Sequence, residues 1–502
     1  MTQNHYYLCN LNIKPMNKLL SRSDDSQFPF WILTISIFII SVLPSLIQDG
    51  MFIDGVQYAA VSKNWANGLG TFWVPYLSQN WYQNFHAMGS NVFLENPPLV
   101  YAIQGLFFKI FGDGLYTERI YGLFIAVTAI LLIANIWKLV TSGNKDIQKL
   151  SWLPVLFWVS MPIVFRSYQM NVQENTMGIF ILASVYFVLK GLENNKHTFL
   201  NIILGGILIF LASLCKGVTG LFPLATVAMY WISGGKIKFL KAVVLSLILL
   251  VVPVLLFILV LLNDTALESL TFYYHSRLLQ RIFNDPVVNS HFHVFLRLFL
   301  DLFPIIIVTS IAYITRRKKL NFNKHMEARR HIIFFLLMGL AGSFPLALTL
   351  VQRDFYLGPS LPFYALAFAL FVSIYVVDGL KQFSQKTQFF TLFRVLGISL
   401  LIGGLLYTGF QVGKAGRDQE ILHDTYLFGE IIEEGTRVHL VESEEDHWRL
   451  ELYLTRYFDI SLGAPVKDSR YIIRSLHDAP PDEELFKLIP TDTRAYELYQ
   501  EK

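Results

Sequence analysis

The 502-residue sequence contains few charged residues and only two cysteines. Asp, Glu, Lys and Arg make up 16% of the chain, whereas a soluble globular protein carries about 25%. Hydrophobic residues make up 54% and the mean hydropathy is +0.45, which excludes an ordinary soluble enzyme and a disordered scaffold. The two cysteines, Cys9 and Cys215, exclude the disulfide framework of a small secreted domain. The composition that remains is that of an integral membrane protein.

The charges that are present are divided unevenly along the chain. Residues 414–502 contain 20 Asp and Glu but 11 Lys and Arg, a net charge of −9, whereas the whole chain has +4. The first 413 residues therefore carry +13. We interpret residues 1–29 as a cytoplasmic segment, residues 30–412 as a membrane body, and residues 413–502 as a water-soluble acidic domain.

The apolar residues are concentrated in runs about as long as a membrane-crossing helix, which needs roughly 20 residues. The first run has a polar segment before it and no small-residue cleavage site after it, so we interpret it as a retained anchor. Residues 97–111 are either a further span or a helix lying in the membrane interface. The sequence thus predicts a polytopic α-helical membrane protein with about 11–13 transmembrane helices. The eleven main predicted spans are about 30–48, 117–138, 151–166, 176–190, 200–214, 217–233, 239–262, 295–315, 331–351, 358–378 and 393–412.

Lys and Arg are concentrated in alternate loops between these spans, including those around Lys145, Lys196, Lys238, Lys318 and Lys386. Positively charged short loops stay in the cytoplasm, so this set defines the cytoplasmic face. An odd number of spans then places the acidic tail on the extracytoplasmic face. That face also holds the long loop 49–116 and several charged residues. Charges at the mouth of a helical bundle are either functional or simply solvated.

The long outer loop begins with an aspartate in an apolar setting. Asp54 follows Phe52 and Ile53, and partial desolvation would raise the pKa and the basicity of its carboxylate, as suits a general base. The same residue also suits the N-cap of a helix over residues 55–67 that ends before Gly68. The two roles are compatible.

Aromatic residues are dense in the same loop, where they form either a membrane-interface belt or a platform for stacking sugars. Pro97 and Pro98 force an extended step before a helix can start, which would hold Glu95 near the membrane surface. The aromatic group comprises Trp73, Trp81, Tyr82, Phe85 and His86.

Five short motifs follow one another on the predicted outer face. They are Phe-Ile-Asp-Gly-Val-Gln-Tyr (52–58), Glu-Asn-Pro-Pro-Leu (95–99), Phe-Gly-Asp-Gly-Leu-Tyr-Thr-Glu-Arg (111–119), Leu-Cys-Lys-Gly-Val-Thr-Gly-Leu-Phe-Pro (214–223) and Gln-Arg-Asp-Phe-Tyr-Leu-Gly-Pro-Ser-Leu-Pro (352–362). The ordered set resembles the GT-C membrane glycosyltransferases. It is most similar to the glycosyltransferase family 39 type, which includes protein O-mannosyltransferases and lipid A aminoarabinose transferases.

The resemblance covers about residues 45–365 and implies the transfer of a sugar from a polyprenyl-phosphate carrier to an extracytoplasmic acceptor, which is a protein, lipid A or another glycan. The Asp in the family's first outer loop is placed as general base, and it corresponds to Asp54. Inversion at the anomeric carbon needs such a base on one face and a stabilised phosphate leaving group on the other. The family usually has a second acid directly after this Asp, where this chain has Gly55, so more weight falls on Asp54.

The resemblance also implies roles for one acid and two cations on the outer face. Glu174 matches an acid that would bind acceptor hydroxyls, assist Asp54 or hold a metal, and the alternative is a helix-start carboxylate favoured by the macrodipole. Lys216 lies in an otherwise uncharged stretch and would bind the carrier phosphate as a point charge. Arg353 would form a bidentate contact with the same phosphate. Snorkelling to lipid headgroups is the alternative for both cations.

A divalent metal is a further implication of the resemblance. Glu95 matches a metal-binding Glu of the aminoarabinose transferases, whereas Asn96 replaces the basic residue that follows it there. Glu95 and His275 are therefore possible metal ligands, although no compact ligand spacing connects them. No other cofactor is predicted. The residues predicted to line the substrate groove are Glu95, Tyr58, Tyr273, Tyr274, His275, Arg277 and Arg281.

From about Asp418 the pattern becomes typical of a soluble protein. Helices are predicted over Ile421–Glu434 and Glu444–Phe458, and strands over Arg437–Val441 and Tyr471–Arg474. These elements predict a small extracytoplasmic α/β domain. It contains no Gly-rich phosphate motif and no metal-ligand spacing, so acceptor recognition and shielding of the groove are both open.

The leading hypothesis is an inverting hexosyl- or pentosyltransferase that uses a polyprenyl-phosphate sugar, contacts membrane lipids and binds no nucleic acid. A bacterial inner membrane, with the active site on the periplasmic side, fits the resemblance. A flippase or transporter for lipid-linked glycans is one alternative, but it would show internal repeats and midplane charges, and the charges here cluster at one face. An oligosaccharide ligase or polymerase would share the carrier and transfer a longer glycan.

Overall fold

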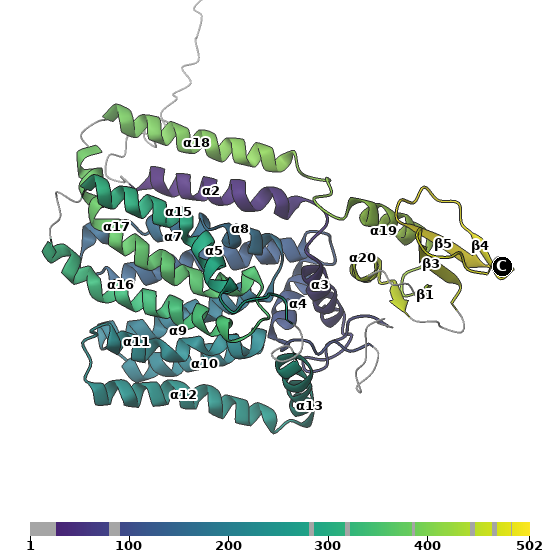
Figure 1. The fold of residues 1–502 in the computed structure, drawn as a ribbon, viewed down its shortest axis with the longest axis horizontal. Helices are drawn as coiled ribbons and strands as arrows, with labels where there is room; N and C mark the ends of the chain where they lie inside the picture. The colour runs from purple at the N-terminus through teal and green to yellow at the C-terminus, as the bar shows by residue number, and fades with distance from the viewer. Residues whose placement is uncertain are drawn as a thin grey trace, which may run out of the picture.

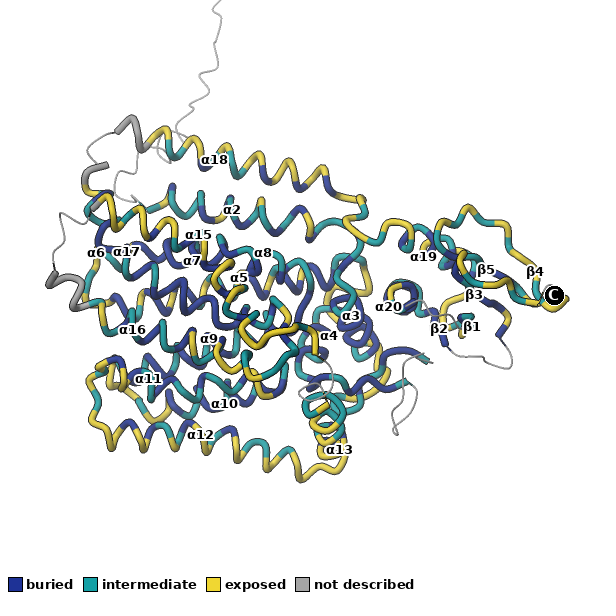
Figure 2. The backbone as a smooth tube through the Cα atoms, in the orientation of Figure 1, coloured by how far each residue is buried: buried dark blue, intermediate teal, exposed yellow. Residues whose placement is uncertain are grey.

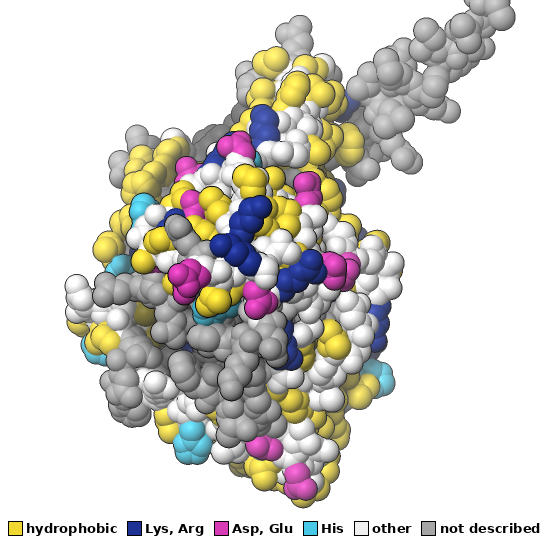
Figure 3. All heavy atoms as spheres, turned by 90° about the vertical axis from the view of Figure 1, so that its right-hand side faces the viewer, with side chains coloured by type: hydrophobic (Ala, Val, Ile, Leu, Met, Phe, Trp, Pro, Cys, Tyr) yellow, Lys and Arg dark blue, Asp and Glu magenta, His cyan; other side chains and the backbone are white. Residues whose placement is uncertain are grey.

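The computed structural model shows a bundle of long helices with a small sheet domain at one end (Figure 1). The helices α3, α4 and α13 lie at the same end of the bundle as the sheet domain, and we call this the outer end. Over the sheet domain, acidic and basic side chains are intermixed at the surface (Figure 3). The structure describes residues 27–79, 91–280, 286–316, 322–383, 387–441, 447–463, 469–482 and 484–502.

Within the described residues, nine segments are long and apolar enough to cross a membrane. The helix α17 is the most enclosed of them, whereas α12 and α18 expose apolar side chains along their length (Figure 2), as lipid-facing helices do. One of the nine segments is Thr198–Ile232. The others belong to α2 (Phe28–Ile47), α5 (Thr117–Val140), α9 (Gln173–Asn194), α12 (Phe239–Leu261), α15 (His293–Arg316), α16 (Phe322–Ser343), α17 (Leu361–Phe383) and α18 (Thr387–Gly409).

The segment Thr198–Ile232 is a hairpin rather than one long helix. It consists of α10 (Thr198–Lys216), the 3₁₀ helix η1 (Gly217–Ala225) and α11 (Thr226–Ile232). Gly217 has φ +71°, a left-handed conformation that favours glycine, and the chain reverses there. Gly220 then packs so closely on α10 that a Cβ atom would lie 2.6 Å from the carbonyl carbon of Ala212. The predicted spans 200–214 and 217–233 therefore correspond to α10 and to η1 with α11.

The structure divides one predicted span and excludes one of the two alternatives for residues 97–111, a further span. The predicted span 151–166 is divided into α7 (Trp152–Val159) and α8 (Pro162–Gln169), because Pro162 starts a new helix. The segment 97–111 forms α4 (Leu99–Phe111), which has 13 residues and is too short to span a bilayer.

The outer end is built from short helices between the spans. The helix α3 packs against α4, and α4 packs against α5. The other short helices of the outer end are α3 (Ile53–Ala66), α13 (Asp264–Phe272), the π-helical η2 (Tyr273–Leu279), and the 3₁₀ helices η4 (Phe344–Leu348) and η5 (Asp354–Ser360). The helix α6 (Lys145–Gln148) lies at the opposite end of the bundle (Figure 2).

The C-terminal domain is a five-stranded mixed sheet, ordered β2-β1-β3-β5-β4, with two helices. The strand β1 pairs in parallel with β2 and β3, whereas β5 pairs antiparallel with β3 and β4. Buried apolar residues of both helices and the sheet, including Phe428, Leu450, Leu454 and Leu498, form one core. The elements are α19 (Gln419–Ile431), β1 (Arg437–Leu440), α20 (Trp448–Phe458), β2 (Ser461–Gly463), β3 (Tyr471–Ser475), β4 (Phe486–Leu488) and β5 (Tyr496–Glu501).

Candidate active site

Asp54 lies in the first turn of α3, where a carboxylate interacts favourably with the helix dipole. The helix begins at Ile53, and Phe52 occupies the N-cap position without a side-chain capping bond. The prediction that Asp54 caps this helix is therefore wrong. Asp54 is half-buried, so its carboxylate keeps some contact with solvent.

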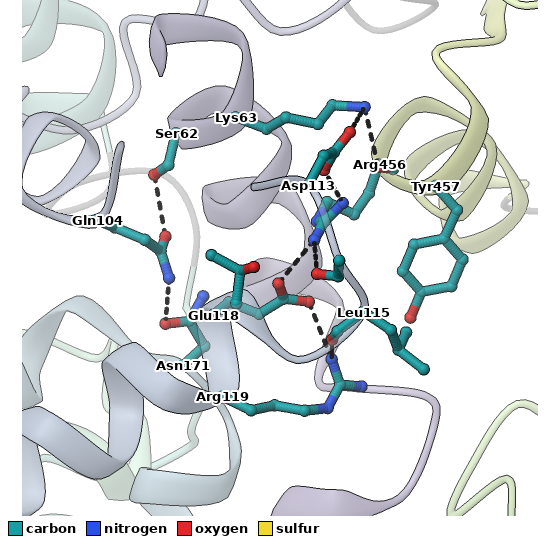
Figure 4. Close-up of polar contacts among 12 residues, drawn as sticks. Ser62, Lys63, Gln104, Asp113, Leu115, Glu118, Arg119, Asn171, Arg456 and Tyr457 are labelled. Carbon is teal, nitrogen blue, oxygen red and sulfur yellow. Dashed lines mark hydrogen bonds and ion pairs between the residues drawn. The ribbon is translucent and has the colours of Figure 1, made fainter. Parts of the chain in front are cut away.

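Gly55, next to Asp54, is enclosed by the turn that precedes α9. A Cβ atom at Gly55 would overlap the carbonyl oxygen of Met170. The side-chain amide of Asn171 donates a 2.9 Å hydrogen bond to the carbonyl of Gly55, and the Gln104 amide donates to Asn171 over 2.9 Å. Ser62 donates to Gln104 in turn (Figure 4). This packing fixes α3 against α4 and leaves no room for a second acid at position 55.

Lys216 and Glu174 form an ion pair beside α3. Lys216 ends α10 and Glu174 lies in the first turn of α9, and the Nζ atom is 3.5 Å from Oε1. The Lys216 ammonium also lies 5.6 Å from the ring centroid of Tyr58, a cation–π geometry. Glu174 is only 2% exposed. A buried carboxylate at this position depends on a nearby cation, which Lys216 supplies.

Tyr58 connects this ion pair with Asp54. Burial raises the pKa of the Tyr58 phenol well above its usual value, and the negative charges of Asp54 and Glu174 raise it further. Asp54 and Glu174 also repel each other electrostatically. Asp54, Tyr58, Glu174 and Lys216, from three helices, therefore form one group that we call the carboxylate–lysine cluster.

A cavity of about 380 Å³ opens next to this cluster, and we call it the polar cavity. Glu174, Lys216 and Arg277 are its charged lining residues, and Asn96 and Tyr273 add polar groups. Asp54 and Tyr58 do not line it but adjoin it through Glu174 and Lys216.

A second cavity of about 330 Å³ adjoins the first and is lined almost entirely by apolar residues; we call it the apolar cavity. It lies among α9, η1, α16, η4 and η5, and its lining includes Leu221, Phe222 and Ala341. The two cavities share the lining residues Met177, Val218, Thr219, Pro345, Leu346 and Tyr356.

The predicted groove residues of η2 are only partly brought to the polar cavity. Arg277 lines it and forms an ion pair with Glu95, which joins the loop before α4 to η2. Tyr274 and His275 do not line it, and their rings contact each other. Tyr273, which was also predicted, lies on the same short helix and lines the cavity. Arg281 lies outside the described residues.

The predicted metal ligands do not form a cluster in the part of the chain that the structure describes. No group of three or more His, Cys, Asp and Glu residues suited to a metal ion occurs there, and Glu95 is paired with Arg277. The metal remains a prediction.

Arg353 is exposed and does not line the polar cavity. Tyr356, three residues later, does line the polar cavity. It belongs to the motif at 352–362, but no role was predicted for it. The aromatic residues Trp81, Tyr82, Phe85 and His86 of the first outer loop lie outside the described residues.

The described chain is similar to known membrane glycosyltransferases. Residues 95–262 match the family described as dolichyl-phosphate-mannose-protein mannosyltransferase. The crystal structure of ArnT from Cupriavidus metallidurans bound to undecaprenyl phosphate matches with a TM-score of 0.62 and 12% identity, over 93% of this chain and 97% of ArnT.

The chain has the GT-C glycosyltransferase fold. The archaeal oligosaccharyltransferase AglB from Archaeoglobus fulgidus, in complex with an inhibitory peptide and a dolichol-phosphate, matches with a TM-score of 0.54 and 11% identity, over 89% of this chain and 69% of AglB. No curated protein matches the chain by sequence. The GT-C fold and the family match over residues 95–262 confirm the resemblance, and the nine membrane-length segments of the described residues fit a multi-pass membrane protein.

Proposed function

We propose that the chain transfers a sugar, with inversion, from a polyprenyl-phosphate carrier to an acceptor at the outer end of the bundle. The observation that carries this proposal is the pair of adjoining cavities. The polar cavity offers Lys216 and Arg277 to a phosphate, and the apolar cavity offers a path to an isoprenyl chain. A phosphate on a long hydrocarbon chain has this division of polarity.

Lys216 is the residue that we assign to the carrier phosphate. Its pairing with the buried Glu174 holds the ammonium at the cavity wall. An ammonium there would stabilise the negative charge that develops on the phosphate as the sugar leaves. Arg277 would add a second positive charge on the opposite element η2. We still predict that Arg353 contacts the carrier phosphate, as the carrier enters the site.

Asp54 is the residue that we assign as general base toward the acceptor hydroxyl. It lies on α3, whereas Lys216 lies on α10. The base and the phosphate-binding cation thus come from different helices. Inversion would place them on opposite faces of the anomeric carbon. Glu174 lies next to both and would bind hydroxyls of the substrates.

The setting that we propose is a bacterial inner membrane with the outer end in the periplasm. The acceptor would be a protein, lipid A or another glycan. The sugar would be a hexose or a pentose.

The test is sugar transfer from a polyprenyl-phosphate donor pool by membranes that contain Asp54→Asn. This change removes the basicity and preserves the size of the side chain, so transfer should fall at least about 100-fold, the effect of losing a general base. Donor binding should be unchanged. The matched control is Asp264→Asn, another first-turn acid of an outer-end helix, which should transfer at the normal rate.

Three outcomes would contradict parts of the proposal. Full activity of Asp54→Asn would move the base elsewhere, with Glu174 as the next candidate. Transfer of a preassembled oligosaccharide rather than one sugar would identify a ligase. Carrier translocation without transfer, by the unmodified protein, would identify a flippase.

A further inference from the structure

The C-terminal domain is joined to the bundle by ion pairs whose cations, Lys63 and Arg456, are buried. Lys63 of α3 is completely buried, and its Nζ atom is 2.6 Å from Asp459 and 3.5 Å from Asp113. The same ammonium donates hydrogen bonds to the carbonyls of Thr455 (3.2 Å) and Arg456 (2.9 Å) at the end of α20. A cation is favourable at a helix C-terminus, so Lys63 binds the end of α20.

Arg456 makes the reciprocal contact from α20 into the bundle. Only 1% of its side chain is exposed, and its guanidinium pairs with Asp113 at 2.6 Å and with Glu118 at 2.8 Å. It also donates to the carbonyl of Gly114 at 3.0 Å. Glu118 is itself buried and pairs with Arg119 at 2.9 Å (Figure 4). We call Lys63, Asp113, Glu118, Arg456 and Asp459 the domain clamp.

A second set of contacts holds the chain just before α3. The two carboxylate oxygens of Asp49 accept hydrogen bonds from Tyr426 (2.7 Å) and Tyr457 (2.9 Å) of the C-terminal domain. The Tyr453 hydroxyl accepts from the backbone N–H of Met51 at 3.1 Å. The helix α20 therefore contacts the segment on both sides of Asp54.

Buried ion pairs contribute little net stability, because the desolvation of two charges offsets their attraction. What a network of several hydrogen-bonded charges does provide is one defined geometry. A domain that only shielded the groove would not need to hold α3 at both ends. We propose that the C-terminal domain positions α3, and with it Asp54, through the domain clamp. Lys63 and Arg456 are then positioning residues for the transfer reaction, an inference that rests on the proposed function.

The test removes the central ion pair of the clamp with its charges balanced. The double variant Glu118→Gln, Arg456→Gln removes both charges of this pair and leaves polar amides in their place. Asp113 keeps Lys63 at 3.5 Å, and Arg119 keeps Asp49 at 3.9 Å. A displacement of about 1 Å can cost about 100-fold in rate, so kcat should fall by about tenfold or more. KM for the donor should change little, because Lys216 is untouched. Amide hydrogen exchange in residues 53–66 should become faster.

The control is Arg474→Gln, Glu497→Gln, which removes a 2.6 Å ion pair inside the C-terminal sheet. It should change neither kcat nor exchange in α3. If the clamp variant does not fold, Arg456→Lys replaces it, because lysine keeps the charge but lacks the forked guanidinium whose two NH₂ groups contact Asp113 and Glu118. An intermediate kcat is then expected.

The proposal is overturned if the clamp variant keeps its kcat, or if kcat falls while exchange in α3 stays unchanged. An equal loss in the control variant also overturns it. If the unmodified protein transfers no sugar, the proposed function fails, and exchange in α3 still decides whether the clamp holds this helix.

Discussion

Lys216 cannot be tested alone, because its removal would leave Glu174 buried without its cation. Breaking such a pair costs about 3–5 kcal/mol of stability. We therefore expect an informative result from the double variant Glu174→Gln, Lys216→Gln, which removes both charges. Hydrogen bonds to charged groups contribute about 1.5–3 kcal/mol, so the Kd for polyprenyl phosphate should rise roughly 10- to 150-fold. Calorimetric titration of the purified protein in nanodiscs measures this change.

The control for this experiment is Lys109→Gln. The Lys109 ammonium also lies over an aromatic ring, 4.5 Å from the centroid of Trp65, but it lines neither cavity. Its removal should leave the Kd unchanged. A double variant at positions 174 and 216 that binds the carrier normally would move the phosphate away from Lys216.

Gly55 offers a separate test of how α3 is held. Because a Cβ atom there would overlap the Met170 carbonyl, Gly55→Ala should displace α3 or the turn before α9. Overpacking of this kind costs about 1–3 kcal/mol, and thermal unfolding in detergent should show a lower Tm. Gly114→Ala is the control, since a Cβ atom there meets nothing within 4 Å. An unchanged Tm for Gly55→Ala would mean that the turn before α9 can shift to accommodate the added Cβ atom without loss of stability.

Between helices, the apolar cavity predicts how the carrier chain is accommodated. Ala341 of α16 lines this cavity opposite η1, so Ala341→Trp should fill part of it. Binding of a long-chain polyprenyl phosphate should weaken by about tenfold, whereas binding of a five-carbon prenyl phosphate should not change, because the short chain does not reach the added ring. Both affinities are measured by titration.

Leu340→Trp is the matched control, because Leu340 precedes Ala341 on α16 but is exposed and lines neither cavity. It should bind both carriers normally. Equal weakening for short and long carriers in Ala341→Trp would show that the chain does not occupy the apolar cavity.

The sequence predicted the elements best where one physical signal dominates. Apolar length identified the spans, including both arms of the α10–η1 hairpin, and Gly217 marks the reversal. The prediction of one span from apolar length failed for residues 151–166, where Met161 and Pro162 interrupt the helix. In the C-terminal domain, α19, α20, β1 and β3 were predicted, whereas β2, β4 and β5 were not. Two of these missed strands have only three residues, too few to show an alternating pattern.

Over the full length of the chain, the site was predictable where residue type and motif coincide. Asp54 and Lys216 were selected as charges in apolar or uncharged stretches, and Glu174 was selected because it matches an acid of the resembled family. The structure brings the three together around Tyr58. The domain clamp was not predictable, since Lys63 and Arg456 are separated by almost the whole chain. The burial of both residues depends on tertiary packing. Nothing in the local sequence distinguishes a buried lysine from one at the surface.

The orientation of the whole chain in the membrane also leads to a prediction. The ends of the bundle differ in charge: loops rich in Lys and Arg were predicted to be cytoplasmic, and the acidic C-terminal domain lies at the outer end. The labelling experiment uses a background with Cys9→Ser, so that Cys215 is the remaining native cysteine. Cys215 is buried and should not react with a maleimide. A membrane-impermeant maleimide should then label Asp482→Cys in intact spheroplasts, because position 482 is exposed on the C-terminal domain.

The matching position at the other end is Lys196, exposed in the loop between α9 and α10. Lys196→Cys should be labelled only after the membrane is permeabilised, because positively charged short loops stay in the cytoplasm. Labelling of both variants in intact spheroplasts would contradict the orientation, and so would labelling of Lys196→Cys alone. Either result would place the carboxylate–lysine cluster on the cytoplasmic face or break the alternation of loops. A cluster on the cytoplasmic face would have access to soluble sugar donors of the cytoplasm. A polyprenyl-linked donor would then not be required.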